Sequence, residues 1–295
     1  MLSYFKKIIP VNIKRFIKNT IKFITNYYWI FYVKHKKINK INIKYYPEKE
    51  NIVVSVTSYG KRLNDLYISL KSILLQSVRP NKVLLYLGND VKKEDLPLNL
   101  IKLEKDNLLE IIFKKENLMS YKKFVYALQE YSNDIIITID DDLIYEKKMI
   151  ELLINSYNKY PNCLSAKRVH KITYNDDGNL LPYSKWKKDY NKCNYPADDL
   201  FATTGAGTLF PPNFFSNISN IIYNDKIFMN ICPKADDVWI KFMCILSKKK
   251  VVYVKGKNDM PLIIKGTQDT ALFNDNVDMN DVYIKKVSEY FKIKI

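Results

Sequence analysis

After residue 46, short apolar runs alternate with segments whose apolar residues recur at helical spacing. The runs 51–57 and 135–139 are apolar and rich in β-branched residues, which is typical of buried strands. In the first helical segment Asn64 or Asp65 is the expected N-cap. The apolar positions expected to form its core face are Leu66, Leu70, Ile73 and Leu74. Because strands and helices alternate, the pattern predicts an α/β fold with a mostly parallel central sheet, covered by helices on both faces.

The apolar run 135–139 ends in three carboxylates, Asp140, Asp141 and Asp142. In open α/β sheets, ligands bind beyond the carboxyl ends of the strands, which is where this triplet lies. Since alternate side chains of an extended segment share a face, we expect Asp140 and Asp142 to point one way and Asp141 the other. Capping of a helix expected over 146–158 would explain one aspartate but hardly three.

Two carboxylates on one face repel each other unless a cation neutralises them. Mg²⁺ and Mn²⁺ are hard ions that take oxygen ligands and bridge one or two carboxylates to a substrate diphosphate. The triplet therefore predicts a Mg²⁺ or Mn²⁺ site with Asp142 and Asp140 as ligands. The chain contains no GxxxxGK or GxGxxG loop, so a nucleotide diphosphate would be held through this metal.

Positive charge is concentrated at the start of the chain. The 295 residues carry a formal net charge of +17, and residues 1–46 contain eleven Lys or Arg and no Asp or Glu. This basic amphipathic arm has a longest uncharged run of eleven residues, 23–33, well short of the ~20 that span a bilayer. No secretory signal is visible, so we expect a cytoplasmic protein.

Two interpretations of the arm remain open. Its aromatic residues and lysines are compatible with a helix lying on an anionic membrane surface, and the protein would then be peripheral to the membrane. The arm is equally compatible with a helix packed on the domain with a solvated lysine face. Basicity alone permits nucleic-acid binding, but no recognition motif is present and none is expected.

The numbers and spacing of cysteines and histidines exclude several kinds of catalytic and metal site. The cysteines Cys163, Cys193, Cys232 and Cys244 form no CxxC pair, which excludes zinc ribbons and redox motifs and favours free thiols. With two histidines, His35 and His170, an ordinary Ser-His-Asp triad is not available. Catalysis would have to depend on carboxylates.

The order of several segments resembles the GT-A glycosyltransferases, in particular family-2-like bacterial enzymes of surface-polysaccharide synthesis. The segments are "VSVTSYGKR", "PNKVLLYLGND", "SYKKFVYAL", "IIITIDDDLIY" with its DXD motif, "FATTGAGTLFPP" and "ADDVWIKFM", within residues 50–245. The resemblance implies a GT-A (Rossmann-like) fold and an inverting, metal-dependent hexosyltransferase. Such an enzyme moves a sugar from a UDP- or GDP-linked donor to a glycan or lipid-linked acceptor.

The resemblance also implies roles for individual residues. Asp142 would be the direct metal ligand, with Asp140 and Asp141 serving ribose and metal-bound water. Asp237 would be the catalytic base and Asp236 would assist the acceptor, although either is also a plausible helix N-cap. The implied donor-binding residues outside the triplet are Thr57, Tyr59, Arg62, Asp90 and Lys123. The loop 203–207, with Thr204 and Gly205, would line the acceptor side.

The sequence also offers candidate sugar-binding tryptophans, a candidate C-terminal metal ligand and domain boundaries. Trp186 and Trp239 are candidate platforms for a sugar ring, with core packing favoured for Trp239. No histidine follows His170 to serve as a C-terminal metal ligand, and that region offers Gln268 and Asp269 instead. The expected organisation is an arm over 1–46, a catalytic domain over 47–260 and a C-terminal extension over 261–295 packed on it.

Two other functions compete with the transferase. A sugar-nucleotide pyrophosphorylase uses carboxylates and magnesium on a similar sheet. Such an enzyme would need a glycine-rich basic loop after the first strand, where the segment "TSYGKRLND" has one glycine. A noncatalytic protein that binds membranes or polyanions through the arm is the other alternative.

Overall fold

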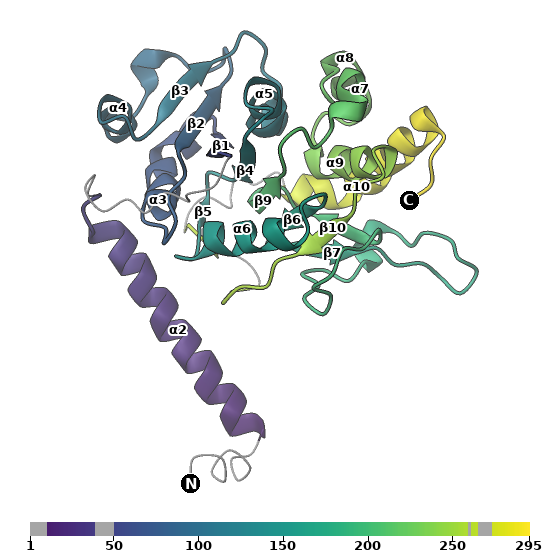
Figure 1. The fold of residues 1–295 in the computed structure, drawn as a ribbon, viewed down its shortest axis with the longest axis horizontal. Coiled ribbons are helices and arrows are strands. Elements are labelled where there is room, and N and C mark those ends of the chain that lie inside the picture. Colours follow the sequence, from purple (N-terminus) through teal and green to yellow (C-terminus); the bar gives the residue numbers. More distant parts are fainter. Residues whose placement is uncertain (1–10, 39–49, 259–260, 265–272) are drawn as a thin grey trace. The chain divides into compact units, whose positions relative to one another are not determined.

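The computed structural model describes residues 11–38, 50–258, 261–264 and 273–295 (Figure 1). The chain divides into two units, Met1–Asn39 and Lys40–Ile295. The first unit contains the helix α2 (Val11–His35). Gln268 and Asp269 lie outside the described residues, as do residues 1–10 and 39–46 of the predicted arm.

The second unit is built on a mixed sheet. Seven strands of the described chain form this sheet in the order β10-β6-β9-β4-β1-β2-β3. All neighbouring pairs are parallel except those that β9 makes with β4 and β6. The strands are β1 (Ile52–Thr57), β2 (Lys82–Leu87), β3 (Glu110–Phe113), β4 (Ile135–Ile139), β6 (Leu164–Ala166), β9 (Ala206–Phe210) and β10 (Val251–Tyr253). The prediction of a mostly parallel sheet is confirmed.

Helices cover both faces of the sheet (Figure 1). One face is covered by α3 (Leu63–Leu74), α4 (Leu98–Lys105) and α6 (Met149–Lys159), and the other by α5 (Lys122–Glu130), α9 (Asp236–Leu246) and α10 (Phe273–Phe291). Shorter helical segments are η1 (Gly60–Arg62), η2 (Lys93–Asp95), η3 (Met119–Tyr121), η4 (Tyr183–Lys185), η5 (Ser216–Ile218), α7 (Ser219–Ile222) and α8 (Asp225–Ile231).

Side-chain alternation explains why the central strands are apolar throughout. Val53 of β1 pairs with Ile136 of β4, and both belong to the large core cluster beneath α5 and α9. Their neighbours Val54 and Ile137 point to the opposite face and are also fully buried. A strand that is buried on both faces has no polar side, so it reads as a continuous apolar run.

Two helix starts differ from the sequence-based prediction. The predicted core face of α3 is buried, but the helix begins at Leu63 and its N-cap, Arg62, makes no capping bond. Neither Asn64 nor Asp65 is the cap. The helix predicted from residue 146 begins at Met149, and Glu146, which precedes it, forms an ion pair with Lys167.

The smaller strands form two separate two-stranded sheets. β5 (Leu143–Ile144) pairs with β11 (Leu262–Ile263), and β7 (Val169–Lys171) pairs with β8 (Leu200–Ala202). The helix α10 packs on α9 and η4 and buries apolar residues such as Val287 in the main core. All four cysteines lie in the described chain and are free thiols.

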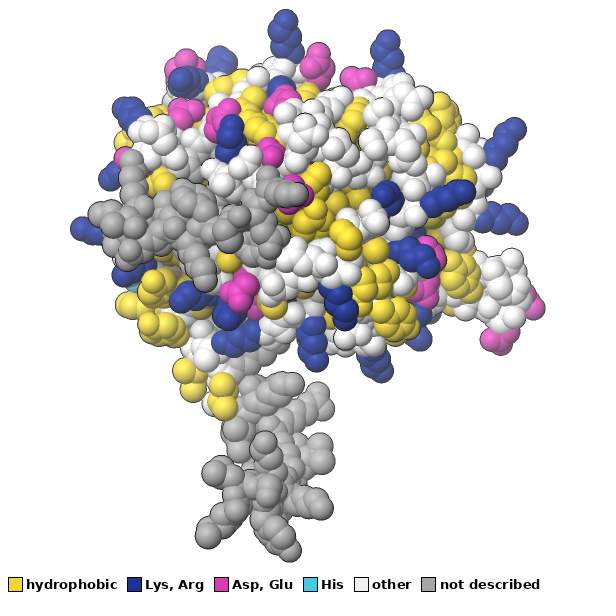
Figure 2. All heavy atoms as spheres, viewed as in Figure 1, with side chains coloured by type: hydrophobic (Ala, Val, Ile, Leu, Met, Phe, Trp, Pro, Cys, Tyr) yellow, Lys and Arg dark blue, Asp and Glu magenta, His cyan; other side chains and the backbone are white. Residues whose placement is uncertain are grey.

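The surfaces of the two units differ in charge. Figure 2 shows Lys, Arg, Asp and Glu side chains interspersed over one face of the molecule. By contrast, the sequence of the first unit holds basic residues and no acidic ones. No helix in the described parts of the chain combines the length and the apolarity that crossing a membrane requires.

Candidate active site

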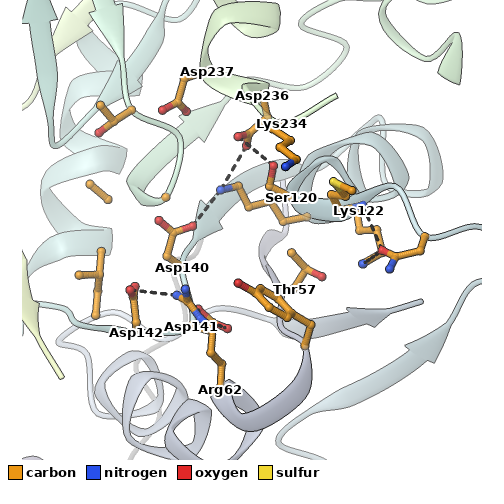
Figure 3. A pocket seen from close by; sticks show the side chains of 18 of the residues that line it. Thr57, Arg62, Ser120, Lys122, Asp140, Asp141, Asp142, Lys234, Asp236 and Asp237 are labelled. Atoms are coloured by element: carbon orange, nitrogen blue, oxygen red, sulfur yellow. Dashed lines mark hydrogen bonds and ion pairs between the residues drawn. The ribbon is translucent and has the colours of Figure 1, made fainter. Parts of the chain in front are cut away.

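The carboxyl ends of β1, β2 and β4 open into a cavity of about 490 Å³. The cavity is lined by the aspartate triplet that follows β4 and by Asp236 and Asp237, the first two residues of α9. Figure 3 shows Asp140 turned toward this acidic pair, whereas Asp141 and Asp142 lie beside Arg62. Residues that are distant in the sequence therefore meet in one cavity.

The triplet does not alternate as predicted. Strand β4 ends at Ile139, so the three aspartates lie in the turn after it rather than in extended backbone. One guanidinium, that of Arg62, pairs with both Asp141 and Asp142, the latter over 2.9 Å. The expectation that Asp140 and Asp142 share a face against Asp141 is wrong, because the turn brings Asp141 and Asp142 to the same cation.

Asp141 is held within the protein. Both of its oxygens accept hydrogen bonds, from Ser58 Oγ at 2.6 Å and from Arg62 Nε at 3.0 and 3.1 Å. Burial raises the pKa of Asp141 despite the opposing charge and hydrogen bond of Arg62. Asp141 therefore orients Arg62 rather than presenting an open carboxylate to the cavity.

The environment of Asp142 disfavours its ionised form. Burial, followed by the nearby charge of Asp140, raises the pKa of Asp142 to about 6, although Arg62 acts in the opposite direction. A carboxyl group with this pKa is partly protonated near neutral pH. A cation bound next to Asp142 would favour its ionised form.

Lys123 connects the triplet to the acidic pair. This lysine is 4% exposed, and its Nζ lies 2.8 Å from Asp140 Oδ1 and 3.3 Å from Asp236 Oδ2. Burial alone would lower the pKa of Lys123, but Asp140 and Asp236 outweigh that effect and raise it. The buried ammonium is held in its charged form between the two acidic groups.

Neither Asp236 nor Asp237 is a helix cap. The N-cap position of α9 is Ala235, and the acidic pair occupies the first turn, where the partial positive charge of the helix N-terminus favours carboxylates. Asp236 accepts a hydrogen bond from Ser120 Oγ at 3.0 Å. The pair therefore lies at the helix start without satisfying its backbone donors through side-chain caps.

Thr204 holds the acidic pair in place. Its backbone N–H donates to Asp237 Oδ1 over 2.7 Å, and its Oγ1 lies 2.8 Å from the same oxygen and 2.9 Å from Asp236 Oδ2. A hydroxyl carries one proton, so Thr204 Oγ1 donates to one carboxylate at a time. Thr204 is fully buried and does not itself line the cavity.

Asp237 has the electrostatic environment of a proton acceptor. Burial, followed by the charge of Asp236, raises the pKa of Asp237 to about 7, while Lys123 and the Thr204 hydrogen bonds oppose the rise. A group whose pKa lies near the working pH combines a useful ionised fraction with a useful affinity for the proton.

The loop between β8 and β9 brings Gly205 against Asp140. A Cβ atom at Gly205 would lie 1.7 Å from Asp140 Oδ2, so any other residue here would displace the Asp140 carboxylate. Thr138 Oγ1 donates to Thr204 O at 2.6 Å, and the buried Tyr145 hydroxyl donates to Gly205 O at 2.5 Å. The Asp140 N–H in turn lies 2.7 Å from the Tyr145 hydroxyl oxygen.

The remaining predicted donor-side residues also line the cavity. Thr57 ends β1, and Tyr59 and Asp90 follow β1 and β2 at the carboxyl edge of the sheet. The Thr57 hydroxyl donates to Tyr86 O at 2.8 Å. Near Asp90, burial lowers the pKa of Lys122, whose Nζ donates to Asn117 Oδ1 at 2.5 Å.

The placement of Trp186 corrects one prediction. Trp186 is 3% exposed, lies in the core cluster and donates its indole N–H to Leu181 O at 2.9 Å. With no exposed ring face, it does not offer a stacking platform for a sugar. Trp239 is fully buried and donates to Ile222 O, so it too is a core residue.

Several residues of the cavity were not singled out from the sequence. They are Asn117, Met119, Ser120, Lys122, Leu143, Arg168 and Lys234. A signal existed for Ser120, which precedes Lys123 by three residues, a spacing that puts both on one side of a helical turn. Tyr145, which lies behind the cavity, was not singled out either, because its hydroxyl joins the backbone of Asp140 to that of Gly205, which is distant in the sequence.

The profile of glycosyl transferase family 2 matches residues 53–217, more than half of the chain. The chain belongs to this family.

A solved structure agrees with the family assignment at the level of the fold. The mannosyltransferase PcManGT from Pyrobaculum calidifontis, solved with GDP-Man and Mn²⁺, has a TM-score of 0.52 at 9% identity, covering 95% of this chain and 75% of that chain. GalNAc-T7, solved with UDP, GalNAc and Mn²⁺, has a TM-score of 0.48 at 12% identity. That match covers 69% of this chain and spans 41% of GalNAc-T7. No curated protein sequence matches this chain. The fold is that of the GT-A glycosyltransferases.

The cavity of this family 2 protein has donor atoms that suit a hard cation. Among the described residues, no group of three or more His, Cys, Asp or Glu side chains is arranged to hold a metal ion. Mg²⁺ and Mn²⁺ do not need such a group, because they commonly take one or two carboxylates and complete their shell with substrate phosphates and water. Burial, followed by the charge of Asp140, raises the pKa of Asp142, and a cation bound there would offset both effects. Asp142 and Asp140 are the side chains that would hold it.

The close approach of Gly205 to Asp140 predicts a coupled effect on stability. Gly205→Ala should lower the free energy of unfolding by about 1–3 kcal/mol, because its methyl group meets the Asp140 carboxylate. In an Asp140→Ala background the obstructing atoms are gone, and the same substitution should cost much less. Urea unfolding of the four proteins of this cycle measures the coupling. An equal cost in both backgrounds would show that the loop and Asp140 do not meet.

Proposed function

We propose that the protein is an inverting, metal-dependent hexosyltransferase that moves a sugar from a nucleoside-diphosphate donor to a glycan or lipid-linked acceptor. The observation that carries the proposal is the meeting of two acidic groups in one cavity. The triplet that follows β4 would serve the donor, and the Asp236–Asp237 pair at the start of α9 would serve the acceptor.

On the donor side, Asp142 and Asp140 would bind Mg²⁺ or Mn²⁺. When bound, such an ion neutralises the diphosphate and stabilises its departure as a leaving group. Arg62, kept in place by Asp141 and Ser58, adds a positive charge at the same end of the cavity. Thr57, Tyr59 and Asp90 would contact the nucleoside, and Lys123 would reach the donor beside Asp140. PcManGT, the neighbour with the same fold, was solved with a nucleoside-diphosphate sugar.

On the acceptor side, Asp237 would be the general base. The acceptor oxygen forms a bond to the anomeric carbon as the bond from that carbon to the diphosphate oxygen breaks, and the acceptor proton passes to Asp237. A single displacement of this kind inverts the anomeric configuration. Thr204 holds Asp237 Oδ1, which fixes the plane of the carboxylate, and Asp236 would help to orient the acceptor hydroxyl.

We propose bacterial surface polysaccharide as the destination of the sugar. A lipid-linked acceptor would be presented at the inner face of the cytoplasmic membrane, so the enzyme would act in the cytoplasm, peripheral to that membrane. The alternative of a sugar-nucleotide pyrophosphorylase has no comparable support, because the loop after β1 contains one glycine and the chain belongs to glycosyl transferase family 2.

A panel of UDP- and GDP-sugars tests the proposal without knowledge of the acceptor. A true donor at a hundred times its dissociation constant should stabilise the fold by about 2.7 kcal/mol, visible as a rise in melting temperature. The rise should require Mn²⁺ or Mg²⁺ and should shrink with EDTA. The proposal fails if no nucleotide sugar of either kind gives a metal-dependent shift.

Two substitutions separate the proposed roles of the acidic groups. Asp142→Asn should abolish metal-dependent donor binding and lower kcat by at least about a hundredfold, since the charge that holds the cation is lost. Asp237→Asn should retain donor binding and lose transfer, because it removes only the proton acceptor. Calorimetric titration of the donor with and without Mn²⁺ compares them, with circular dichroism as the folding control. Wild-type donor binding and turnover in Asp142→Asn would contradict the metal assignment.

The pH dependence of turnover should follow the ionisation of Asp237. Its base form is required, so kcat/KM should fall as the pH decreases below about 7, the pKa of this carboxyl. Thr204→Val removes the hydroxyl hydrogen bond that favours the ionised form and should move this acidic limb to higher pH. Thr204→Ser, which keeps a hydroxyl, is the matched control. An acidic limb at the same pH in the valine and serine variants would separate Asp237 from the observed ionisation.

A further inference from the structure

Helix α2 carries a stripe of exposed apolar side chains. The stripe consists of Ile21, Phe23, Ile24, Tyr27, Tyr28 and Phe31, which are between 55% and 72% exposed. At about 100° per residue, these six positions fall within an arc of about 160° on one side of the helix. Figure 2 shows hydrophobic side chains at the surface along the described turns of α2.

The opposite side of the same helix is basic in sequence. Positions 14, 15, 18 and 22 are all Lys or Arg, and their spacing puts them in the half-turn away from the stripe. The helix ends in Lys34 and His35, followed by Lys36 and Lys37, and has no acidic residue. From residue 13 to residue 28, the apolar and cationic positions of the sequence are therefore segregated, whereas Trp29 and Val33 fall on the basic side and Lys34 falls within the arc of the stripe.

This combination points to one kind of partner. Single exposed apolar residues are ordinary, but a contiguous apolar face marks a surface that binds a partner or a membrane. The partner must also be anionic, because eleven positive charges over residues 1–46 have no acidic residue among them. An anionic bilayer satisfies both requirements, since its phosphates lie directly above its acyl chains. A nucleic acid satisfies only the second.

We infer that α2 is an in-plane membrane anchor that binds anionic lipids. The stripe enters the boundary between headgroups and acyl chains, and the lysines and arginines contact the lipid phosphates. No helix in the described chain is fit to span the bilayer, so attachment through α2 is reversible and depends on both the stripe and the charge. Its benefit to catalysis rests on the proposed lipid-linked acceptor, but membrane binding itself does not.

Co-sedimentation of the full chain with vesicles of phosphatidylglycerol and phosphatidylcholine tests the inference in the absence of nucleotide sugar. Ile24→Ser combined with Tyr28→Ser removes an aliphatic and an aromatic residue four positions apart in the stripe. This pair should lower the partition coefficient by at least about tenfold, since each buried apolar side chain contributes to insertion. The matched control is Leu98→Ser combined with Tyr195→Ser, which are 83% and 61% exposed outside α2 and should bind as wild type does.

Charge is tested in the same assay. Pure phosphatidylcholine vesicles, or salt raised to 0.5 M, should release the wild-type protein. Equal pelleting of the stripe variant and wild type would overturn the inference, as would binding that is indifferent to lipid charge. Binding to RNA or heparin that is tighter than binding to anionic vesicles, and unchanged in the stripe variant, would assign the arm to a polyanion instead.

Two controls keep the outcomes distinct. Melting temperatures of the stripe variant and the control variant should match that of wild type, which separates loss of the anchor from loss of the fold. Metal-dependent stabilisation by a nucleotide sugar should be unchanged in both variants. Failure of membrane binding with intact donor binding would therefore overturn the anchor alone, and the reverse result would overturn the proposed activity alone.

Discussion

The compensation of buried negative charge is the constraint on which this site depends. The triplet after β4 and the pair at the start of α9 bring several carboxylates into one cavity, where water screens them poorly. Arg62 and Lys123 are the cations that keep them together, Arg62 against Asp141 and Asp142, Lys123 between Asp140 and Asp236. Removing one partner of such a group leaves a buried charge without compensation, which is costly.

The negative charges of the two acidic groups are compensated to different extents, so Asp142 and Asp237 have different chemical properties. At Asp142 burial and the charge of Asp140 outweigh the effect of Arg62, and the pKa of Asp142 rises to about 6. At Asp237 burial and the charge of Asp236 dominate, and its pKa rises to about 7. The environment of Asp142 suits a carboxylate that binds a cation. The environment of Asp237 suits a carboxylate that accepts a proton.

Rigid backbone contacts set the distance between these groups. The loop between β8 and β9 passes so close to Asp140 that a side chain at position 205 would displace its carboxylate, and the hydroxyls of Thr138 and Tyr145 donate hydrogen bonds to the carbonyls of Thr204 and Gly205. The same loop supplies the Thr204 N–H and hydroxyl to Asp237. A short segment of small residues thus ties the end of β4 to the start of α9.

The sequence by itself determined the layers of the fold and the residues at the carboxyl edge of the sheet. Apolar runs such as 135–139 predicted buried strands, and the loops after parallel strands meet at one edge of the sheet, so Asp90 and Asp140 were expected at the same edge, where both line the cavity. Only the tertiary structure decided that Asp142 turns toward Arg62, that Lys123 bridges two acidic groups, and that Trp186 is buried. These facts depend on turn geometry and on packing between segments far apart in the chain, which local periodicity does not record.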